Sequence, residues 1–131
     1  MHLTKASHES PTFPKPTSRL AQRTARLRED QRAEQAFKRA VWDRDEGRCR
    51  VCGVRCLRVL TLHPRRGEVH HLEGRHRLTR YEPRCAILVC AVCHERLTHH
   101  RIRVWAGRRW FTEEGTSLID ADAPLTFEVM P

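Results

Sequence analysis

The sequence predicts a small α+β domain, and three observations support this prediction. The chain has 131 residues, a length that fits one domain. The stretch from Arg19 to Asp45 contains neither Pro nor Gly, as one long helix requires, and shorter segments follow it. Large apolar residues are scarce, because the hydrophobic fraction of 39% includes six cysteines and many alanines. Such a small core needs a staple, and the cysteines are the candidates for it.

The chain is strongly basic, and its charge is unevenly distributed. The formal net charge is +9. Residues 1–109 contain all of the Lys and Arg and carry +14, whereas residues 110–131 carry −5. Of the 25 basic residues, 22 are Arg, whose guanidinium group makes forked contacts to phosphates. The basic body favours nucleic acid as a partner. The alternative explanation is that the abundance of Arg reflects the base composition of the genome.

The sequence gives no reason to expect a membrane partner. No apolar run approaches the ~20 residues that span a bilayer, and residues 1–16 lack the apolar core of a signal peptide. We therefore expect a cytoplasmic protein. In that reducing compartment, six cysteines are interpreted as metal ligands before they are interpreted as disulfides.

The order of the expected elements follows from breaks and periodicity. Residues 1–18, with three prolines, are expected to form a disordered arm that ends in Ser18 as a helix cap. In the helix 19–45, five residues have the spacing of one buried face: Ala33, Ala36, Phe37, Ala40 and Val41. The domain proper is expected over 19–112. After the helix it contains strands at 57–62 and 68–72, a buried segment at 86–89, a helix at 90–99, and a hairpin of 101–105 and 109–111 that turns at 106–107. An acidic C-terminal tail follows at 113–131, with a strand expected at 125–130.

Two Cys-x-x-Cys pairs, separated by 37 residues, predict a structural zinc site. A two-residue gap lets one tight turn direct both sulfurs at one ion, and four thiolates leave no open position on it. A redox dithiol at one pair and disulfides between the pairs are the alternatives. Cys56 and Cys85 are expected to be small buried residues, with Cys56 as a weaker candidate for a ligand. The four expected zinc ligands are Cys49, Cys52, Cys90 and Cys93.

Three histidines form the second constellation. His70 and His71 lie in an expected strand, and His94 follows the last cysteine of the second pair directly. The zinc site therefore fixes His94 relative to that strand. An ion held by only two protein ligands keeps positions for phosphate oxygens and water, and a neutral histidine beside it can take a proton from that water.

The order of these motifs resembles the zinc-bearing branch of the HNH endonuclease family over about residues 41–100. The motifs are the first Cys-x-x-Cys pair, then Glu68–His71, then Cys85–His94. The resemblance implies a ββα-metal (His-Me) finger, in which a hairpin, a loop and a helix surround one divalent ion. It implies that His70 and His94 bind this ion (Mg²⁺, Mn²⁺ or Zn²⁺) and that His71 is the general base. It also assigns the four cysteines to structural zinc and favours DNA over RNA as substrate.

One position departs from the family pattern. The family's middle Asn would stand fourteen residues after His71 and five before Cys90, where this chain has Cys85; the chain contains no Asn. Because a thiol forms only weak hydrogen bonds, the departure predicts a looser loop and reduced or lost activity. Four arginines in and after this loop are expected either to contact phosphates or to be simply solvated: Arg75, Arg77, Arg80 and Arg84.

The resulting prediction is a metal-dependent endonuclease that hydrolyses phosphodiester bonds in DNA. The first alternative is a non-catalytic zinc module that binds nucleic acid, which the Cys85 departure favours. The second is a protein-interaction adaptor, for example within a phage packaging or mobile-element complex. No oligomeric state, target sequence or strand preference is predicted.

Overall fold

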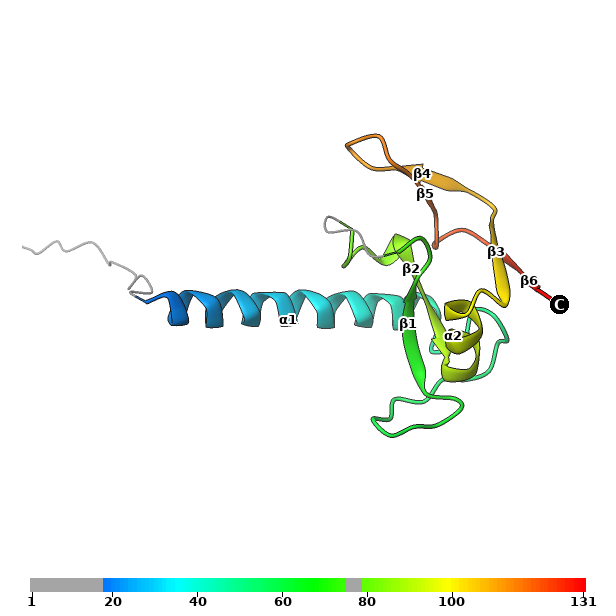
Figure 1. Cartoon of the computed structure of the whole chain (residues 1–131), viewed down its shortest axis with the longest axis horizontal. Helices are drawn as coiled ribbons and strands as arrows, with labels where there is room; N and C mark the ends of the chain where they lie inside the picture. The colour runs from blue at the N-terminus through cyan, green and yellow to red at the C-terminus, as the bar shows by residue number, and fades with distance from the viewer. Residues whose placement is uncertain (1–17, 75–78) are drawn as a thin grey trace, which may run out of the picture. The chain divides into compact units, whose positions relative to one another are not determined.

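The computed structural model of the chain describes residues 18–74 and 79–131 (Figure 1). The disordered arm expected over residues 1–18 lies, apart from Ser18, outside these ranges. The structure confirms a small α+β protein with an N-terminal helix and small antiparallel sheets. In the described residues the elements are α1 (Arg19–Arg44), β1 (Gly67–His71), the 3₁₀ helix η1 (Pro83–Cys85), β2 (Ala86–Cys90), α2 (Ala91–Thr98), β3 (Ile102–Ala106), β4 (Arg109–Phe111), β5 (Ser117–Ile119) and β6 (Leu125–Val129).

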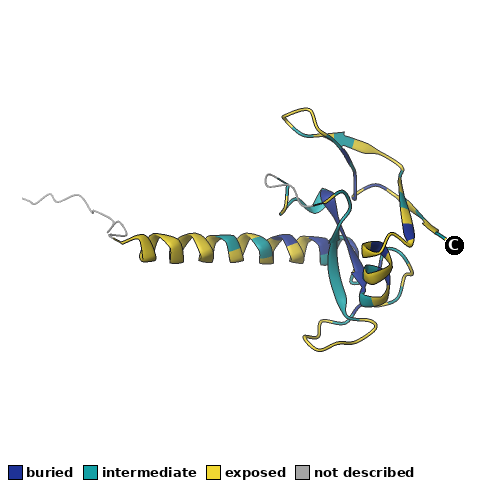
Figure 2. Ribbon diagram, in the orientation of Figure 1, coloured by how far each residue is buried: buried dark blue, intermediate teal, exposed yellow. Residues whose placement is uncertain are grey.

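Helix α1 begins and ends where its sequence predicts. The Ala21 N–H donates to Ser18 Oγ at 3.0 Å, which is the expected cap. The helix ends one residue early, at Arg44, and the next turn contains Gly47 in the left-handed region, at φ +67°. The chain divides after Arg32 into two units, and in the first unit the helix is almost wholly exposed (Figure 2). In the second unit α1 buries Phe37 and Val41, whereas the three alanines of the expected face are exposed.

Strands β1 and β2 pair antiparallel, and α2 follows β2 directly. The register runs from Gly67 opposite Cys90 to His71 opposite Ala86. All five residues of β2 are buried, whereas those of β1 are half-buried. The buried segment expected at 86–89 and the helix expected at 90–99 are therefore confirmed, the helix as Ala91–Thr98. The Cys90 sulfur caps that helix by accepting from the Cys93 N–H.

The strand predicted at 57–62 is wrong. In this segment only Leu57 forms a bridge, to Arg66, and Leu60 is exposed. The segment forms a loop that closes through the Leu57 N–H to the Arg65 carbonyl at 2.7 Å. The segment 57–62 has the apolar-rich composition of a strand, but β1 pairs instead with β2, whose fully buried side chains form the core.

The predicted hairpin turning at 106–107 is also wrong, although both of its strands exist. Strand β3 pairs with β6, and β4 forms its hairpin with β5. After β3 the chain runs close to Pro124, which directly precedes β6: a Cβ added at Gly107 would stand 2.7 Å from the Pro124 carbonyl oxygen. β3 therefore lies beside β6 and pairs with it, with Ala106 opposite Leu125. The acidic segment 113–131 contains β5 and β6, and the strand expected at 125–130 is found as β6.

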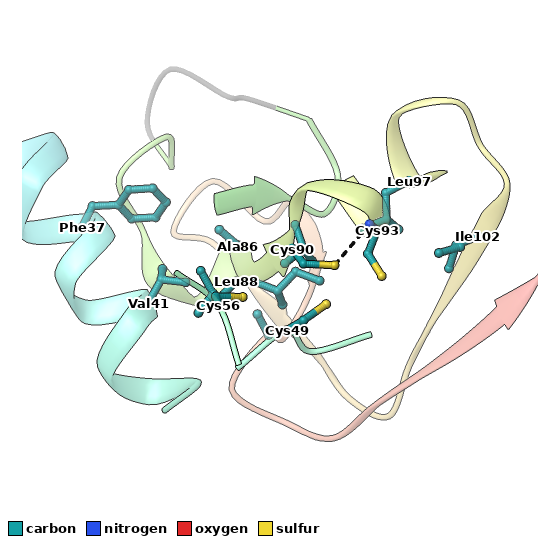
Figure 3. Close-up of a cluster of buried hydrophobic side chains, with 13 residues drawn as sticks. Phe37, Val41, Cys49, Cys56, Ala86, Leu88, Cys90, Cys93, Leu97 and Ile102 are labelled. Atoms are coloured by element: carbon teal, nitrogen blue, oxygen red, sulfur yellow. Dashed lines mark hydrogen bonds between the residues drawn. The ribbon is translucent and has the colours of Figure 1, made fainter. Parts of the chain in front are cut away.

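The core lies around β2 (Figure 3). Phe37 and Val41 of α1, Leu97 of α2 and Ile102 near the start of β3 pack in the same buried cluster as Ala86–Cys90. Within residues 18–74 and 79–131, no helix combines the length and apolar character needed to cross a membrane.

A buried carboxylate ties this core together. Asp45 is 7% exposed and accepts hydrogen bonds from Arg44, from Arg50 and from the Leu88 N–H at 2.8 Å. Arg50 also donates to the Ala121 carbonyl at 2.8 Å. The end of α1, the turn after it, β2 and the C-terminal segment therefore share one polar network.

Candidate functional site

The four predicted cysteines form one cluster. Their sulfurs all lie within 4.8 Å of one another, and the Cys52 and Cys90 sulfurs are 3.8 Å apart. Four sulfurs about 2.3 Å from one tetrahedral ion would be about 3.8 Å from each other, so the cluster fits a structural metal such as zinc. The six cysteines of the chain are all free of disulfides.

Local backbone geometry prepares the cysteines for a metal. In each pair the N–H of the second cysteine points at the sulfur of the first, from Cys52 to Cys49 and from Cys93 to Cys90, both at 3.5 Å. Burial would raise the pKa of Cys49, but backbone N–H groups outweigh it and lower the pKa. Burial raises the pKa of Cys90 and of Cys93. Cys56 is buried outside the cluster, and burial raises its pKa to about 12.

The three predicted histidines line one cleft of about 460 Å³. His70 and His71 come from the end of β1, and His94 comes from the first turns of α2. The other lining residues are Glu34, Phe37 and Lys38 of α1, Val69 of β1, and Gly74 and Tyr81. The three histidines therefore lie together, as one side of a single cleft.

His70 and His94 stand edge to face. Their ring centres are 5.3 Å apart and their planes are 72° apart. Burial, and then the charges of His94 and His71, lower the pKa of His70 to about 4, so its ring is neutral at pH 7. Within the described ranges, the cysteine cluster is the only set of three or more close metal-ligand atoms. The histidine pair therefore offers two ligands at most.

Glu68 is a functional candidate that the sequence reasoning gave no role. Its Oε2 is hydrogen bonded to His94 Nδ1, and it lies two residues before His70 on the same strand. Because an ionised carboxylate only accepts, Nδ1 carries the proton and Nε2 keeps its lone pair. Side chains two apart on a strand share a face, and this rule could have found Glu68.

The His71 ring is held on two sides. It stacks on Phe37, with ring centres 5.3 Å apart and planes 24° apart. Its Nε2 lies 2.7 Å from the Arg80 carbonyl oxygen. Because a carbonyl can only accept, Nε2 carries the hydrogen, and Nδ1 is the nitrogen that can accept a proton.

The predicted phosphate contacts lie in different settings. Arg75 and Arg77 fall outside the described residues. The Arg80 guanidinium lies 4.8 Å from the Tyr81 ring centre and is exposed. Arg84 bonds to Asp120 at 3.3 Å and stacks on a tryptophan, so a carboxylate already neutralises it. Among the described residues that line the cleft, the positively charged side chain of the Lys or Arg type is that of Lys38, which the sequence analysis did not single out.

Cys85, where the resemblance would place an Asn, is buried. Burial raises its pKa to about 11, and a hydrogen bond with Thr79 partly offsets that rise. The neutral thiol therefore offers the neighbouring loop only a weak hydrogen-bonding group.

The fold and the cluster define a small α+β protein with a four-cysteine site able to hold a structural metal. Comparisons of the chain with protein-family models, with curated proteins and with solved structures found no match.

Proposed function

We propose that the protein is a metal-dependent endonuclease that hydrolyses phosphodiester bonds in DNA, with the ββα-metal arrangement of the HNH family. The observation that carries the proposal is the setting of His71. Its ring is fixed by Phe37 and the Arg80 carbonyl, and it shares a cleft with the His70–His94 pair. A fixed imidazole beside two further imidazoles is the equipment needed to activate water next to a bound ion.

His70 and His94 are the residues that would hold the catalytic ion, which could be Mg²⁺, Mn²⁺ or Zn²⁺. When bound, this ion supplies positive charge to the phosphate and to its departing oxygen. Glu68 acts as a positioning residue, because its bond to Nδ1 of His94 keeps the other ring nitrogen available as a ligand.

His71 is the proposed general base. Its Nδ1 accepts a proton from the attacking water while Nε2–H stays bonded to the Arg80 carbonyl. The ring becomes positively charged in this step, and the carbonyl dipole stabilises that charge. Phe37 keeps the ring plane fixed, so the nitrogen does not have to be reoriented for each reaction.

A structural metal held by the four cysteines would act only as a scaffold. Cys93 is the residue before His94, so a metal bound there would fix the start of α2 against the turn after α1. The position of His94 relative to β1 then depends on the cysteine cluster.

The test incubates supercoiled plasmid with wild type and His71→Ala, with added Mg²⁺ or Mn²⁺. We expect His71→Ala to lower the cleavage rate about 10²- to 10⁴-fold, the usual contribution of a general base. His99→Ala is the matched control, because His99 is exposed and lies outside the residues that line the cleft. Equal cleavage by wild type and His71→Ala would refute the assigned base.

A second candidate function is a zinc-containing module that binds nucleic acid without cutting it. The buried thiol of Cys85 favours this candidate, because an amide would bond the loop more strongly. The same plasmid assay with Cys85→Asn separates the two. A wild type that binds DNA without cutting, together with a variant that cuts, would support the non-catalytic module.

A further inference from the structure

A second groove, of about 420 Å³, adjoins the histidine cleft and is lined by cations. Its basic residues come from α1 and from the loop before β1, and Trp42 also lines it. Among the described residues that line it, none is acidic. The basic residues are Lys38, Arg39, Arg58 and Arg66.

Packing holds one of these cations in place. The edge of the Trp42 ring lies so close to Gly67 that an added Cβ there would stand 2.4 Å from a ring carbon. The Arg58 guanidinium lies 4.1 Å from the centre of this ring. Arg58 is therefore presented to solvent on a rigid aromatic support, an arrangement that reduces the entropy lost when it binds an anion.

Two of the four basic side chains have an acidic partner nearby, and two do not. Lys38 pairs with Glu34 at 3.1 Å, and Arg66 lies 3.9 Å from a carboxylate oxygen of Glu68. Within the part of the chain that the structure describes, Arg39 and Arg58 form no ion pair with an acidic side chain. The groove therefore carries uncompensated positive charge, and a polyanion fits it.

The groove and the cleft share one lining residue, Lys38. Gly67, at the first position of β1, lines the groove, whereas His71, at the last position, lines the cleft. These positions are about 13 Å apart on a strand. One nucleic-acid backbone can therefore lie along both.

The loop beside the groove ends in exposed apolar side chains. Leu60 and Leu62 are each 94% exposed. Arg66 donates to the Leu60 carbonyl at 3.3 Å, which fixes this part of the loop beside the cations. Leucines flanked by arginines have the chemistry of a side chain that packs against sugars and bases while the arginines bind phosphates.

We propose that this groove binds the phosphate backbone of the nucleic acid whose scissile phosphate lies in the histidine cleft. Arg39 and Arg58 contact phosphates, and Leu60 and Leu62 pack against sugars and bases. The position of the scissile phosphate rests on the proposed nuclease function. Binding by the groove does not, so the two can be tested separately.

The experiment measures the Kd of a labelled 20-bp DNA duplex in buffer without added divalent ion, over a range of salt concentrations. For Arg39→Gln with Arg58→Gln, we expect Kd to rise roughly tenfold or more near 0.1 M salt. We expect the slope of log K against log salt to fall by about 1.8, because each lost phosphate contact removes about 0.9. Leu60→Ser should weaken binding without changing this slope. The matched control is Arg103→Gln, because Arg103 is also exposed and also stacks on a tryptophan, at 5.4 Å, but lies on β3.

Each outcome has one meaning. Duplex binding that depends on Arg39 and Arg58 in a protein that cuts no plasmid would support the groove and refute the nuclease. Plasmid cutting with a Kd and a salt slope unchanged by these substitutions would refute the groove and leave the nuclease standing. Failure of the wild type to bind duplex, or an equal loss in Arg103→Gln, would also overturn the groove proposal. The groove proposal would also be overturned if Leu60 were found to bind a protein partner and that binding did not depend on salt.

Discussion

At the scale of single residues, the Glu68 carboxylate makes the most testable contact of the cleft. It reaches from β1 to His94 on α2 and accepts a hydrogen bond from Nδ1 of that ring. We predict that Glu68→Ala weakens Mn²⁺ binding, measured by electron paramagnetic resonance, about 10- to 100-fold, the usual effect of losing such an orienting group. Glu68→Gln should recover part of the loss, because an amide oxygen still accepts the hydrogen bond.

Glu95→Ala is the control for this measurement, because Glu95 is an exposed carboxylate on α2, the helix that carries His94. It should bind Mn²⁺ as the wild type does. If Glu68→Ala and Glu95→Ala bind the ion equally well, Glu68 has only a structural role.

The cysteines could be found from the sequence, whereas Glu68 and Lys38 could not be assigned roles in the same way. Each cysteine pair is a local motif, and a two-residue gap brings its sulfurs together in any context. The bond of Glu68 joins residues 26 positions apart, and Lys38 reaches the cleft only because α1 packs there. Strand alternation could have placed Glu68 on the face of His70, but its bond to His94 and the position of Lys38 depend on the packing of elements, which spacing along one chain does not specify.

At the scale of elements, we expect α2 to depend on the cysteine cluster. It has only eight residues, which is too short for a helix to be stable alone. We predict that Cys52→Ser removes the bound zinc, measured as zinc per chain by atomic emission, and lowers the helical circular dichroism. Cys52 is the exposed ligand, so its replacement disturbs no buried side chain.

Cys56→Ala is the matched control for zinc binding. Cys56 is buried outside the cluster, so this variant should keep one zinc per chain. Loss of zinc from Cys56→Ala, with retention in Cys52→Ser, would reverse the assignment of ligands.

Two elements differ from their predictions for one physical reason. The helices were predicted to within about a residue, because caps and breaks are local features. The strand expected at 57–62 and the hairpin expected at 106–107 required knowledge of partners. β1 instead pairs with β2, and β3 pairs with β6 across an intervening hairpin. Strand composition indicates the capacity to pair, while burial of distant side chains selects the partner.

At the scale of the whole molecule, Asp45 connects segments that lie far apart in the chain. Its side chain is 1% exposed and binds two arginines. We predict that Asp45→Asn lowers the free energy of unfolding by about 3 kcal/mol, because it removes the buried charge that the half-buried guanidinium groups of Arg44 and Arg50 face, although Arg44 keeps Asp122 as a partner. Urea unfolding at a fixed zinc concentration measures this change, with Asp43→Asn, an exposed neighbour, as the control.

The difference in free energy of unfolding between wild type and Asp45→Asn should depend on pH. Burial alone would raise the pKa of Asp45, but hydrogen bonds from Arg44 and Leu88, together with the charges of Arg44 and Arg50, hold this pKa below its ordinary value. The contribution of the carboxylate is therefore complete above about pH 4 and is lost as the pH falls further. The difference between wild type and Asp45→Asn should stay constant from about pH 7 to about pH 5 and narrow below about pH 4. A difference that vanished already near pH 6 would contradict the lowered pKa.

Arg50 has a consequence for the order in which the protein matures during synthesis. It stands between the first two cysteines, and its guanidinium donates to the carbonyls of Ala121 and Ala123, more than 70 residues later. A ribosome adds about 5 to 20 residues per second, so several seconds pass between translation of this arginine and of its acceptors. The turn that carries Cys49 and Cys52 therefore emerges several seconds before the carbonyls that Arg50 binds, and the hydrogen bonds that join this turn to residues 121–123 can form only after that interval.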